Sequence, residues 1–344
     1  MSFFERTDVF AALDLGTTNC RLLVARPAGD GMRIIDSFSR IVRLGEGLDA
    51  SGLLSDIAME RTIDALGVCS SKLRQRRVTH ARLVATEACR RATNCAEFLG
   101  RVRNATGLEL EIIPTSEEAR LALAGCAPLL DPHRPHAVVF DIGGGSTEVL
   151  WVRVRTGRRG RPRTEVKGIV SIPFGVVALT ERFCERGQSP QAFDEMVDYV
   201  RTQFLDFDER WGISRQIARG GVQMLGSSGT VTTLAGIKLG LPRYDRAQVD
   251  GGVLDFRDIA DVTAGLVAMD GAGRAAQPCV GAGRADLMPA GCAILKAICT
   301  LWPVGRLRVA DRGVREGILA GLMAAARRSA TQPDAVSNGR PLPT

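Results

Sequence analysis

The chain has 344 residues, of which 45% are hydrophobic and 24% are charged, and its formal net charge is +7. This length favours two domains, and no stretch reaches the ~18 uninterrupted apolar residues of a membrane helix. The composition therefore excludes membrane-spanning, fibrous and wholly disordered proteins. Residues 1–9 lack the basic and apolar segments of a secretory signal, so we expect a cytoplasmic protein.

Three residue types limit the kinds of site that the chain can hold. The nine cysteines never form a C-x-x-C pair, and none of the three histidines is followed by Asp, so neither a thiolate site nor a histidine-ligated metal site is indicated. Any metal should therefore be bound by oxygen. The positive charge comes almost entirely from arginine, which suits bidentate contacts to phosphate oxygens. An anionic partner and a simple bias toward arginine explain this charge about equally well.

The first predicted elements are a strand, a polar turn and a second strand. Apolar residues 9–14 lead through the turn 15–19 into the apolar run 22–25, and the same pattern returns over residues 137–154. In this alignment Asp14 matches Asp141, and Gly16 matches Gly143. Two matching hairpins, each followed by mixed strands and helices, predict a duplicated α/β domain.

Helices and strands alternate along the rest of the chain, as in an α/β layer fold. Periodicity predicts helices over 55–76, 94–106, 117–125, 286–301 and 312–328, and strands over 81–85, 108–113 and 306–310. Residues 153–167 hold six arginines among glycine and proline and predict a long exposed basic hairpin loop, usually solvated but able to contact a polyanion.

These predicted elements divide the chain into two tails and two domains. We expect an N-terminal tail over 1–8, a first domain over 9–133, a second domain over 134–311 and a disordered tail over 329–344. The helix 312–328 could pack back on the first domain.

Three turns of small residues are candidate phosphate-binding sites. Glycine lets backbone amides approach an oxyanion, and hydroxyl groups add donors. A single turn of this kind is more often simply a turn, so the phosphate-binding interpretation depends on finding three of them. The candidate residues are Thr17, Thr18 and Asn19 in the first turn, Gly143, Gly144, Gly145, Ser146 and Thr147 in the second, and Ser228, Gly229 and Thr230 in the third.

Carboxylates accompany these turns. Asp14 and Asp141 each end a predicted strand, where they could hold a hard cation such as Mg²⁺ together with phosphate oxygens, or could bond only their own turn amides. Duplication favours the metal site, and Glu148 follows the second turn. Glu118 fits a capping box with Thr115 as N-cap, so the residues alone favour a structural cap there. Arg90 could clamp a phosphate, although one arginine among many is weak evidence.

Six segments together resemble the exopolyphosphatase and guanosine pentaphosphate phosphohydrolase family of the actin, Hsp70 and sugar-kinase superfamily. They are A-L-D-L-G-T-T-N at 12–19, A-T-E-A-C-R at 85–90, E-E-A-R at 117–120, F-D-I-G-G-G-S-T-E at 140–148, G-S-S-G-T at 226–230 and R-G-V-R-E-G at 312–317. Their order and spacing match the family from residue 9 to about residue 325.

The resemblance implies an α/β fold of two actin-like (ribonuclease H-like) domains with a phosphate chain bound in the cleft between them. It implies that Glu118 is the general base that activates water, that Asp141 is a metal ligand, and that Glu148 is a partner of the metal or the water. Arg90 becomes a phosphate clamp, and Asp14 with its turn forms the opposite wall. The implied cofactor is Mg²⁺ or Mn²⁺, with a monovalent cation as a further activator.

The sequence departs from the family in two places. The first turn usually reads G-S-N-S or G-S-N-T, whereas the residues at 16–19 displace the Asn by one position and look closer to a sugar kinase. Longer members carry C-terminal helical domains, one of them related to His-Asp phosphohydrolases. We expect no such domain here. Apolar surface that such a domain would cover could instead be buried in a homodimer.

The expected function is therefore exopolyphosphatase activity, the metal-dependent release of orthophosphate from the end of inorganic polyphosphate. The first alternative is hydrolysis of pppGpp to ppGpp by the same residues. A kinase of the same superfamily and a non-catalytic polyphosphate or alarmone sensor are weaker alternatives. The partner is polyphosphate or (p)ppGpp, and no nucleic acid or membrane is expected.

Overall fold

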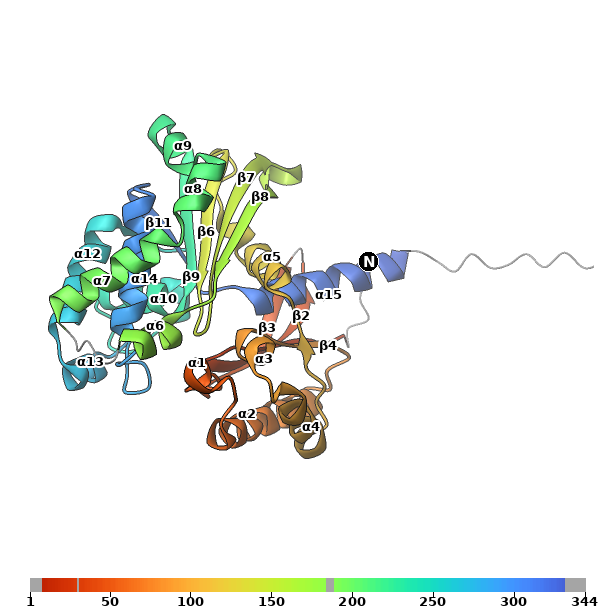
Figure 1. Ribbon diagram of the computed structural model, residues 1–344. Coiled ribbons are helices and arrows are strands. Elements are labelled where there is room, and N and C mark those ends of the chain that lie inside the picture. Colours follow the sequence, from red (N-terminus) through yellow and green to blue (C-terminus); the bar gives the residue numbers. More distant parts are fainter. Residues whose placement is uncertain (1–7, 30, 184–188, 332–344) are drawn as a thin grey trace, which may run out of the picture.

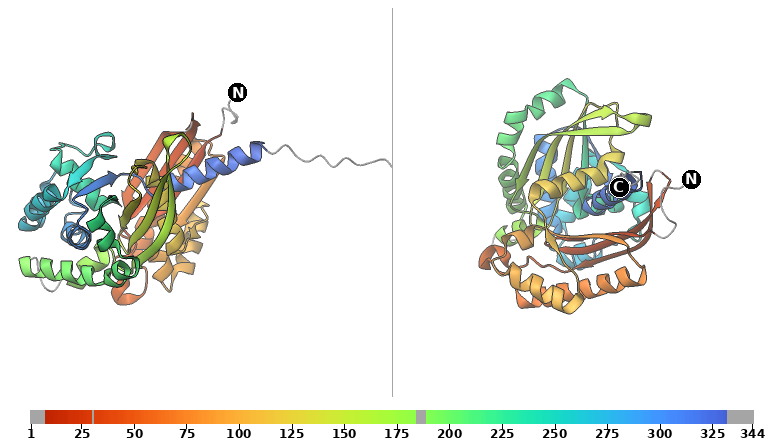
Figure 2. Two further views of the ribbon diagram at one scale, coloured as in Figure 1. Left: turned by 90° about the horizontal axis from the view of Figure 1, so that it is seen from above. Right: turned by 90° about the vertical axis from the view of Figure 1, so that its right-hand side faces the viewer.

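A computed structural model describes residues 8–29, 31–183 and 189–331 of the chain. They form two lobes, each built on one mixed β-sheet, with two helices between the sheets (Figures 1 and 2). The predicted α/β fold with two domains of the same type is confirmed. Within these ranges, no helix combines the length and the apolar character needed to cross a membrane.

The first lobe holds a five-stranded sheet of order β3-β2-β1-β4-β5. β1 is antiparallel to β2 and parallel to β4, and their alternating apolar residues build a core under α2 and α4. Of the predicted strand 108–113, only two residues, Glu111–Ile112, pair in the sheet. The elements are β1 (Phe10–Leu15), β2 (Asn19–Ala28), β3 (Gly31–Ile41), α1 (Leu48–Ser51), α2 (Asp56–Gln75), β4 (His80–Ala85), α3 (Glu87–Arg91), α4 (Cys95–Thr106) and β5 (Glu111–Ile112).

The second lobe holds a six-stranded sheet of order β10-β11-β9-β6-β7-β8. Its strands are β6 (His136–Ile142), β7 (Thr147–Thr156), β8 (Pro162–Ile172), β9 (Val222–Ser228), β10 (Val253–Asp255) and β11 (Arg306–Ala310). Its helices are α6 (Val176–Phe183), α7 (Pro190–Thr202), α8 (Leu205–Trp211), α9 (Ile213–Arg219), α10 (Gly229–Lys238), α11 (Arg246–Val249), α12 (Phe256–Ala268), α13 (Gly271–Ala276) and α14 (Met288–Leu301).

The two lobes repeat one arrangement of strands. In the first lobe Asp14 pairs across the hairpin with Arg21 and lies beside Val84 of a parallel strand. In the second lobe Asp141 pairs with Glu148 and lies beside Ser227 of a parallel strand. Because the carboxyl ends of β1 and β6 occupy equivalent places in the two sheets, Asp14 and Asp141 are structural equivalents. The internal duplication expected from the sequence is confirmed.

The segment 153–167 lies in a hairpin, as predicted, but the prediction that most of it is a long exposed loop is wrong. β7 and β8 run through most of this segment as a paired ribbon, and only residues 157–161 connect them. The exposed side chains Arg153, Arg155 and Arg163 alternate with more buried residues along the two strands. The sequence suggested a loop because glycine and proline cluster around 157–162, but this cluster forms only the turn of a hairpin.

Two helices fill the space between the sheets. α5 (Thr115–Cys126) contributes Ala119 and Leu123 to a cluster on the second sheet, and α15 (Val314–Thr331) packs Ile318 and Leu319 on the first sheet. Glycines bring these helices close together, since a methyl group at Gly317 would collide with the carbonyl oxygen of Leu121.

Both predicted tails fall largely outside the described residues. α15 continues through residue 331, so the expected tail over 329–344 begins in the helix, and the rest lies outside the described residues. Most of the expected N-terminal tail 1–8 also lies outside them.

Candidate active site

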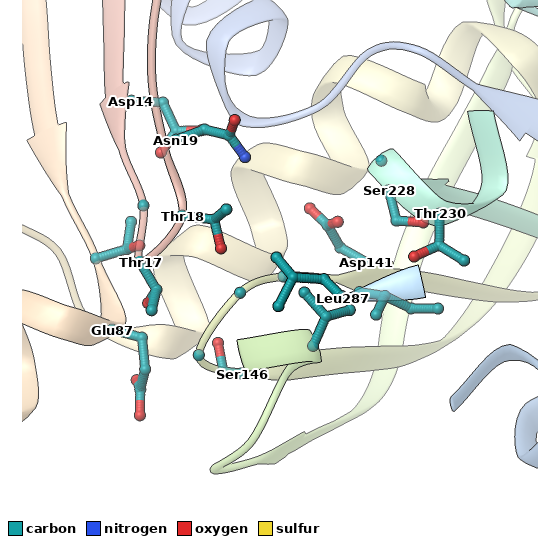
Figure 3. Close-up of a pocket in the computed structure, with 18 of the residues that line it drawn as sticks. Asp14, Thr17, Thr18, Asn19, Glu87, Asp141, Ser146, Ser228, Thr230 and Leu287 are labelled. Atoms are coloured by element: carbon teal, nitrogen blue, oxygen red, sulfur yellow. The ribbon is translucent and has the colours of Figure 1, made fainter. Parts of the chain in front are cut away.

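All three predicted phosphate turns meet at one cavity between the lobes. The cavity has a volume of about 120 Å³ and is lined by the first turn, by the second turn up to Ser146 and by the N-terminal end of α10. Figure 3 shows Thr17 and Thr18 on one side of this space, with Asp141, Ser228 and Thr230 on the other. Segments more than two hundred residues apart in the chain therefore share one polar pocket.

The two hairpin turns have the same backbone geometry. The amide of Gly16 donates to the carbonyl oxygen of Asn19, and the amide of Gly143 donates to that of Ser146, both at 2.9 Å. The turns also touch each other, since a methyl group at Gly144 would collide with Oγ1 of Thr18. Glycine at this position is therefore required for close contact between the lobes.

Helix α6 orients the glycines of the second turn. The amides of Val176 and Val177 donate to the carbonyl oxygens of Gly143 and Gly144, at 3.0 and 2.9 Å. In a planar trans peptide the N–H points opposite to the C=O, so the amides that follow these carbonyls point away from α6. Two adjacent backbone donors are thus available to an anion.

Hydroxyl groups of the first turn are unsatisfied. Oγ1 of Thr17 and Oγ1 of Thr18 are buried and have no hydrogen-bond partner among the described residues. Burying a hydroxyl group without a partner is costly, so these two atoms suit a bound ligand that accepts hydrogen bonds. In the third turn Ser228 caps α10, because its Oγ accepts from the amide of Val231 at 2.9 Å.

Thr147 does not reach the cavity, although it was expected to bind phosphate. Its side chain is fully buried, and its hydroxyl group donates to the carbonyl oxygen of Phe174 at 3.1 Å. Thr147 begins β7, and strand alternation turns its side chain away from the neighbouring Ser146, which does line the cavity.

Four carboxyl groups in and beside the cavity have raised pKa values. Burial, followed by the charges of neighbouring carboxylates, raises the pKa of Asp141 to about 7 and that of Glu118 to about 8. Burial and Asp141 likewise raise the pKa of Glu148 to about 7, and burial raises that of Asp14. Such crowding of acidic groups is typical of a site that is completed by a cation.

Glu148 lies behind the cavity. It is the cross-strand neighbour of Asp141, is 2% exposed, and accepts a hydrogen bond from Oγ of Ser171 at 2.9 Å. It does not line the cavity. Glu148 would therefore act on a bound ligand only indirectly, through a neighbouring residue or through a cation beside Asp141.

Glu118 is not a helix cap. Pro114 is the N-cap of α5, and its carbonyl oxygen accepts from the amides of Glu117 and Glu118, so the predicted capping box with Thr115 is wrong. The proline fixes an extended backbone one residue earlier than the sequence pattern suggested. Glu118 lines the cavity instead.

Arg90 differs from the expected phosphate clamp. Its Nη1 donates to Oε2 of Glu118 at 2.8 Å and to the carbonyl oxygen of Ile113 at 2.9 Å. Its Nη2 and Nε donate to Oε2 of Glu87 at 2.7 and 3.0 Å. Arg90 does not line the cavity, so its guanidinium group holds Glu118 rather than pointing at the space for a phosphate.

Three other arginines supply the positive charge that the sequence analysis missed. Arg21 and Arg284 line the cavity, and Arg21 and Arg315 form no hydrogen bond or ion pair with other described residues. Burial lowers the pKa of Arg284 and of Arg315. No signal in the sequence distinguishes Arg284 within its glycine-rich segment, whereas Arg21 could have been found as the cross-strand partner of Asp14.

A second chamber adjoins the first. Its volume is about 450 Å³, and it shares Asp14, Asp141 and Arg284 with the smaller cavity. Arg315 and the rings of Phe38 and Tyr244 line it as well. The site can therefore hold a ligand larger than a single phosphate group.

Two duplicated actin-like lobes and a polar cleft between them, lined by phosphate-binding turns, define a class of proteins that act on phosphate compounds. Residues 23–326 match the family model described as the Ppx/GppA phosphatase family, and the chain belongs to this family.

Known relatives agree with this assignment. The chain is 29% identical to exopolyphosphatase 2 of Mycobacterium tuberculosis, over 90% of this chain and 96% of that protein. It is 27% identical to a guanosine-5'-triphosphate,3'-diphosphate pyrophosphatase of Photobacterium profundum, over 93% of this chain but only 60% of that longer protein. The structure of the Aquifex aeolicus Ppx/GppA family member aligns with a TM-score of 0.72 at 28% identity, covering 92% of this chain and 98% of that one.

Proposed function

We propose that this protein hydrolyses the terminal phosphoanhydride bond of inorganic polyphosphate and releases orthophosphate. The observation that carries the proposal is the position of Glu118. Its carboxyl group faces a cavity whose other walls offer backbone amides, the unpartnered hydroxyl groups of Thr17 and Thr18, and the guanidinium groups of Arg21 and Arg284. The Mycobacterium tuberculosis relative that carries the name exopolyphosphatase supports this choice.

Glu118 is suited to act as a general base. Its pKa of about 8 lies near neutral pH, where a carboxylate can both remain partly ionised and accept a proton from water. Arg90 fixes the carboxyl group from the side opposite the cavity. A water molecule oriented by Glu118 would lose its proton to this carboxylate as it attacks the terminal phosphorus atom.

The turns and arginines would grip the phosphate chain. Donors of the second turn, Thr17 and Thr18 can bind the terminal phosphoryl oxygens, where negative charge changes during reaction. Arg21 and Arg284 have no carboxylate partner among the described residues and can pair with the following phosphate groups. Because both arginines are half-buried, such pairs would be stronger than contacts at the surface.

Asp14 and Asp141 would hold Mg²⁺ or Mn²⁺. Neither side chain forms a hydrogen bond within the described residues, and burial raises the pKa of both carboxyl groups although the charge of Arg21 opposes this shift. Among the described residues, no group of three His, Cys, Asp or Glu side chains could hold a metal ion by itself. A cation at Asp14 and Asp141 would therefore also use phosphate oxygens and water as ligands. When bound, the ion would neutralise charge on the phosphate oxygens.

A second candidate is hydrolysis of pppGpp to ppGpp. The second chamber favours it, because Phe38 and Tyr244 offer aromatic rings to a nucleoside and Arg315 offers a cation to further phosphate groups. The Photobacterium profundum relative is named for an activity of this kind.

Substrate comparison tests the proposal. Purified protein would be given polyphosphate, pppGpp, or ATP with a sugar alcohol, each with Mg²⁺, and released orthophosphate would be measured. A higher kcat/KM for polyphosphate supports the proposal, and a higher value for pppGpp supports the second candidate. Phosphate transfer to the sugar alcohol would identify a kinase, and tight binding of polyphosphate without release would identify a sensor.

A further inference from the structure

The side chain of Arg43 connects the two lobes next to the cavity. Arg43 follows β3 in the first lobe, and its Nη2 donates to Oδ1 of Asp286 at 2.7 Å and to the carbonyl oxygen of Gly283 at 3.0 Å. Both acceptors belong to the segment 277–287 between α13 and α14 of the second lobe. The same segment carries Arg284 into both chambers.

The backbone of Arg43 is held in an uncommon conformation. Its φ is 45°, in the left-handed region that arginine rarely adopts. The amides of Val42 and Arg43 both donate to the carbonyl oxygen of Thr18, at 2.8 and 3.0 Å. Arg61 donates to the carbonyl oxygens of Val42 and Arg43 from the other side. A strained residue persists only where its surroundings fix it, so the first phosphate turn sets the direction of the Arg43 side chain.

The segment that Arg43 holds is packed closely against the first lobe. A methyl group at Gly283 would lie 2.8 Å from Cδ1 of Ile41, the last residue of β3. The next residue, Arg284, is half-buried near Arg21, and burial and this neighbouring charge both lower its pKa. Among the described residues of the second lobe, its guanidinium group has only a long hydrogen bond of 3.5 Å, to Oγ1 of Thr233. Arg21 repels Arg284 and Asp311 attracts it, and because the hydrogen bond is long, the position of Arg284 depends mainly on the contacts that hold the rest of the segment.

We propose that Arg43 and Asp286 form an interlobe latch that positions Arg284 for substrate binding. The inference rests on the proposed function, because Arg284 is taken to bind the phosphate chain. Without the latch, the segment would populate positions in which Arg284 cannot contact the substrate. Apparent affinity falls in proportion to the fraction of molecules in the competent position, so loss of the latch raises KM and leaves kcat nearly unchanged.

A double-mutant cycle tests the latch. Arg43→Ala and Asp286→Ala should each raise KM for polyphosphate about two- to fivefold, with kcat changed less than about twofold. The KM of the double variant should be no higher than that of the single variant with the higher KM, because both substitutions remove the same ion pair. The matched control is Arg101→Ala, which breaks an ion pair of 2.8 Å with Asp56 within the first lobe and should leave KM unchanged.

Equilibrium binding separates failure of the latch from failure of the proposed function. The probe is methylenebis(phosphonate), a pyrophosphate analogue whose P–C–P bridge resists hydrolysis, and its Kd is measured by calorimetry. A raised Kd in both single variants, without additivity in the double variant, supports the latch. If the unchanged protein binds the probe and hydrolyses polyphosphate while the variants bind equally well, or their effects add, the latch is overturned and the function stands. If the unchanged protein neither binds the probe nor releases phosphate from polyphosphate or pppGpp, both inferences fall.

Discussion

Arg90 donates to Glu118 at 2.8 Å and to Glu87 at 2.7 Å, so one buried guanidinium group links two carboxylates beside the interlobe cavity. The three side chains are between 12% and 15% exposed, which shields these ion pairs from solvent. Glu87 and Arg90 both belong to the short helix α3, and Glu118 belongs to α5. Glu87 fixes the arginine, and the arginine fixes the carboxyl group that faces the cavity.

Replacing Arg90 tests whether it positions Glu118 or binds phosphate. In Arg90→Ala, misplacement of Glu118 should lower kcat about 10- to 100-fold with little change in KM, whereas loss of a phosphate clamp would raise KM. Glu87→Gln should lower kcat less, because one neutral acceptor for Arg90 remains. Steady-state kinetics distinguish the two outcomes. The control is Arg91→Ala, since Arg91 pairs with Asp49 and not with Glu118.

Glycine replacements test the contact between the phosphate turns. Gly144→Ala should sharply reduce activity, because its methyl group would collide with Thr18 across the cavity. Gly100→Ala is the control, since Gly100 lies within α4 with no atom near the added methyl group. That variant should keep full activity and gain about 0.5–1 kcal/mol of stability by the helix preference for alanine. Phosphate release and thermal melting would be measured for both, and equal activities would contradict the turn contact.

Stability of the protein without divalent cations should fall as pH rises. The pKa values of Glu118, Asp141 and Glu148 are raised to about 7 or 8, so the folded state binds protons more tightly than the unfolded state. The stabilisation is complete below the unfolded pKa values of about 4 and is lost as pH rises through the folded values. Melting temperatures in chelator should therefore decrease from pH 5 to pH 8. Added Mg²⁺ should restore stability most at pH 8, and a pH-independent effect of Mg²⁺ would argue against a site at these carboxylates.

Charge removal distinguishes the cavity from the basic ribbon of β7 and β8. Arg21→Gln should raise KM for polyphosphate about 10- to 100-fold, because charge-assisted hydrogen bonds contribute about 1.5–3 kcal/mol. Arg155→Gln on the exposed ribbon should leave KM unchanged. A similar rise in KM for both variants would instead show that the ribbon contacts the polyanion, as the sequence left open.

The sequence predicted those parts of the fold that depend on local pattern. The matching of Asp14 with Asp141 revealed the duplication, and the helices predicted from Ser55 and Asn94 begin one residue later, at Asp56 and Cys95. It could not predict that Arg90 contacts Ile113 and Glu118, because these residues lie 23 and 28 positions away and meet Arg90 only through tertiary packing. It also could not place Arg284, whose position depends on contacts between the lobes. The role of Glu118 came only from resemblance, since the local pattern favoured a cap.

The most direct test of the account is phosphate release by Glu118→Gln compared with Glu117→Gln. The two residues are neighbours in α5, but Glu117 pairs with Arg82 away from the cavity, while Glu118 lines it. Loss of a general base costs about 10²–10⁴ in rate, so Glu118→Gln should lower kcat by that factor with substrate affinity retained. Glu117→Gln should keep kcat near that of the unchanged protein. Full activity of Glu118→Gln, or an equal loss in both variants, would contradict the assignment of Glu118 as the base.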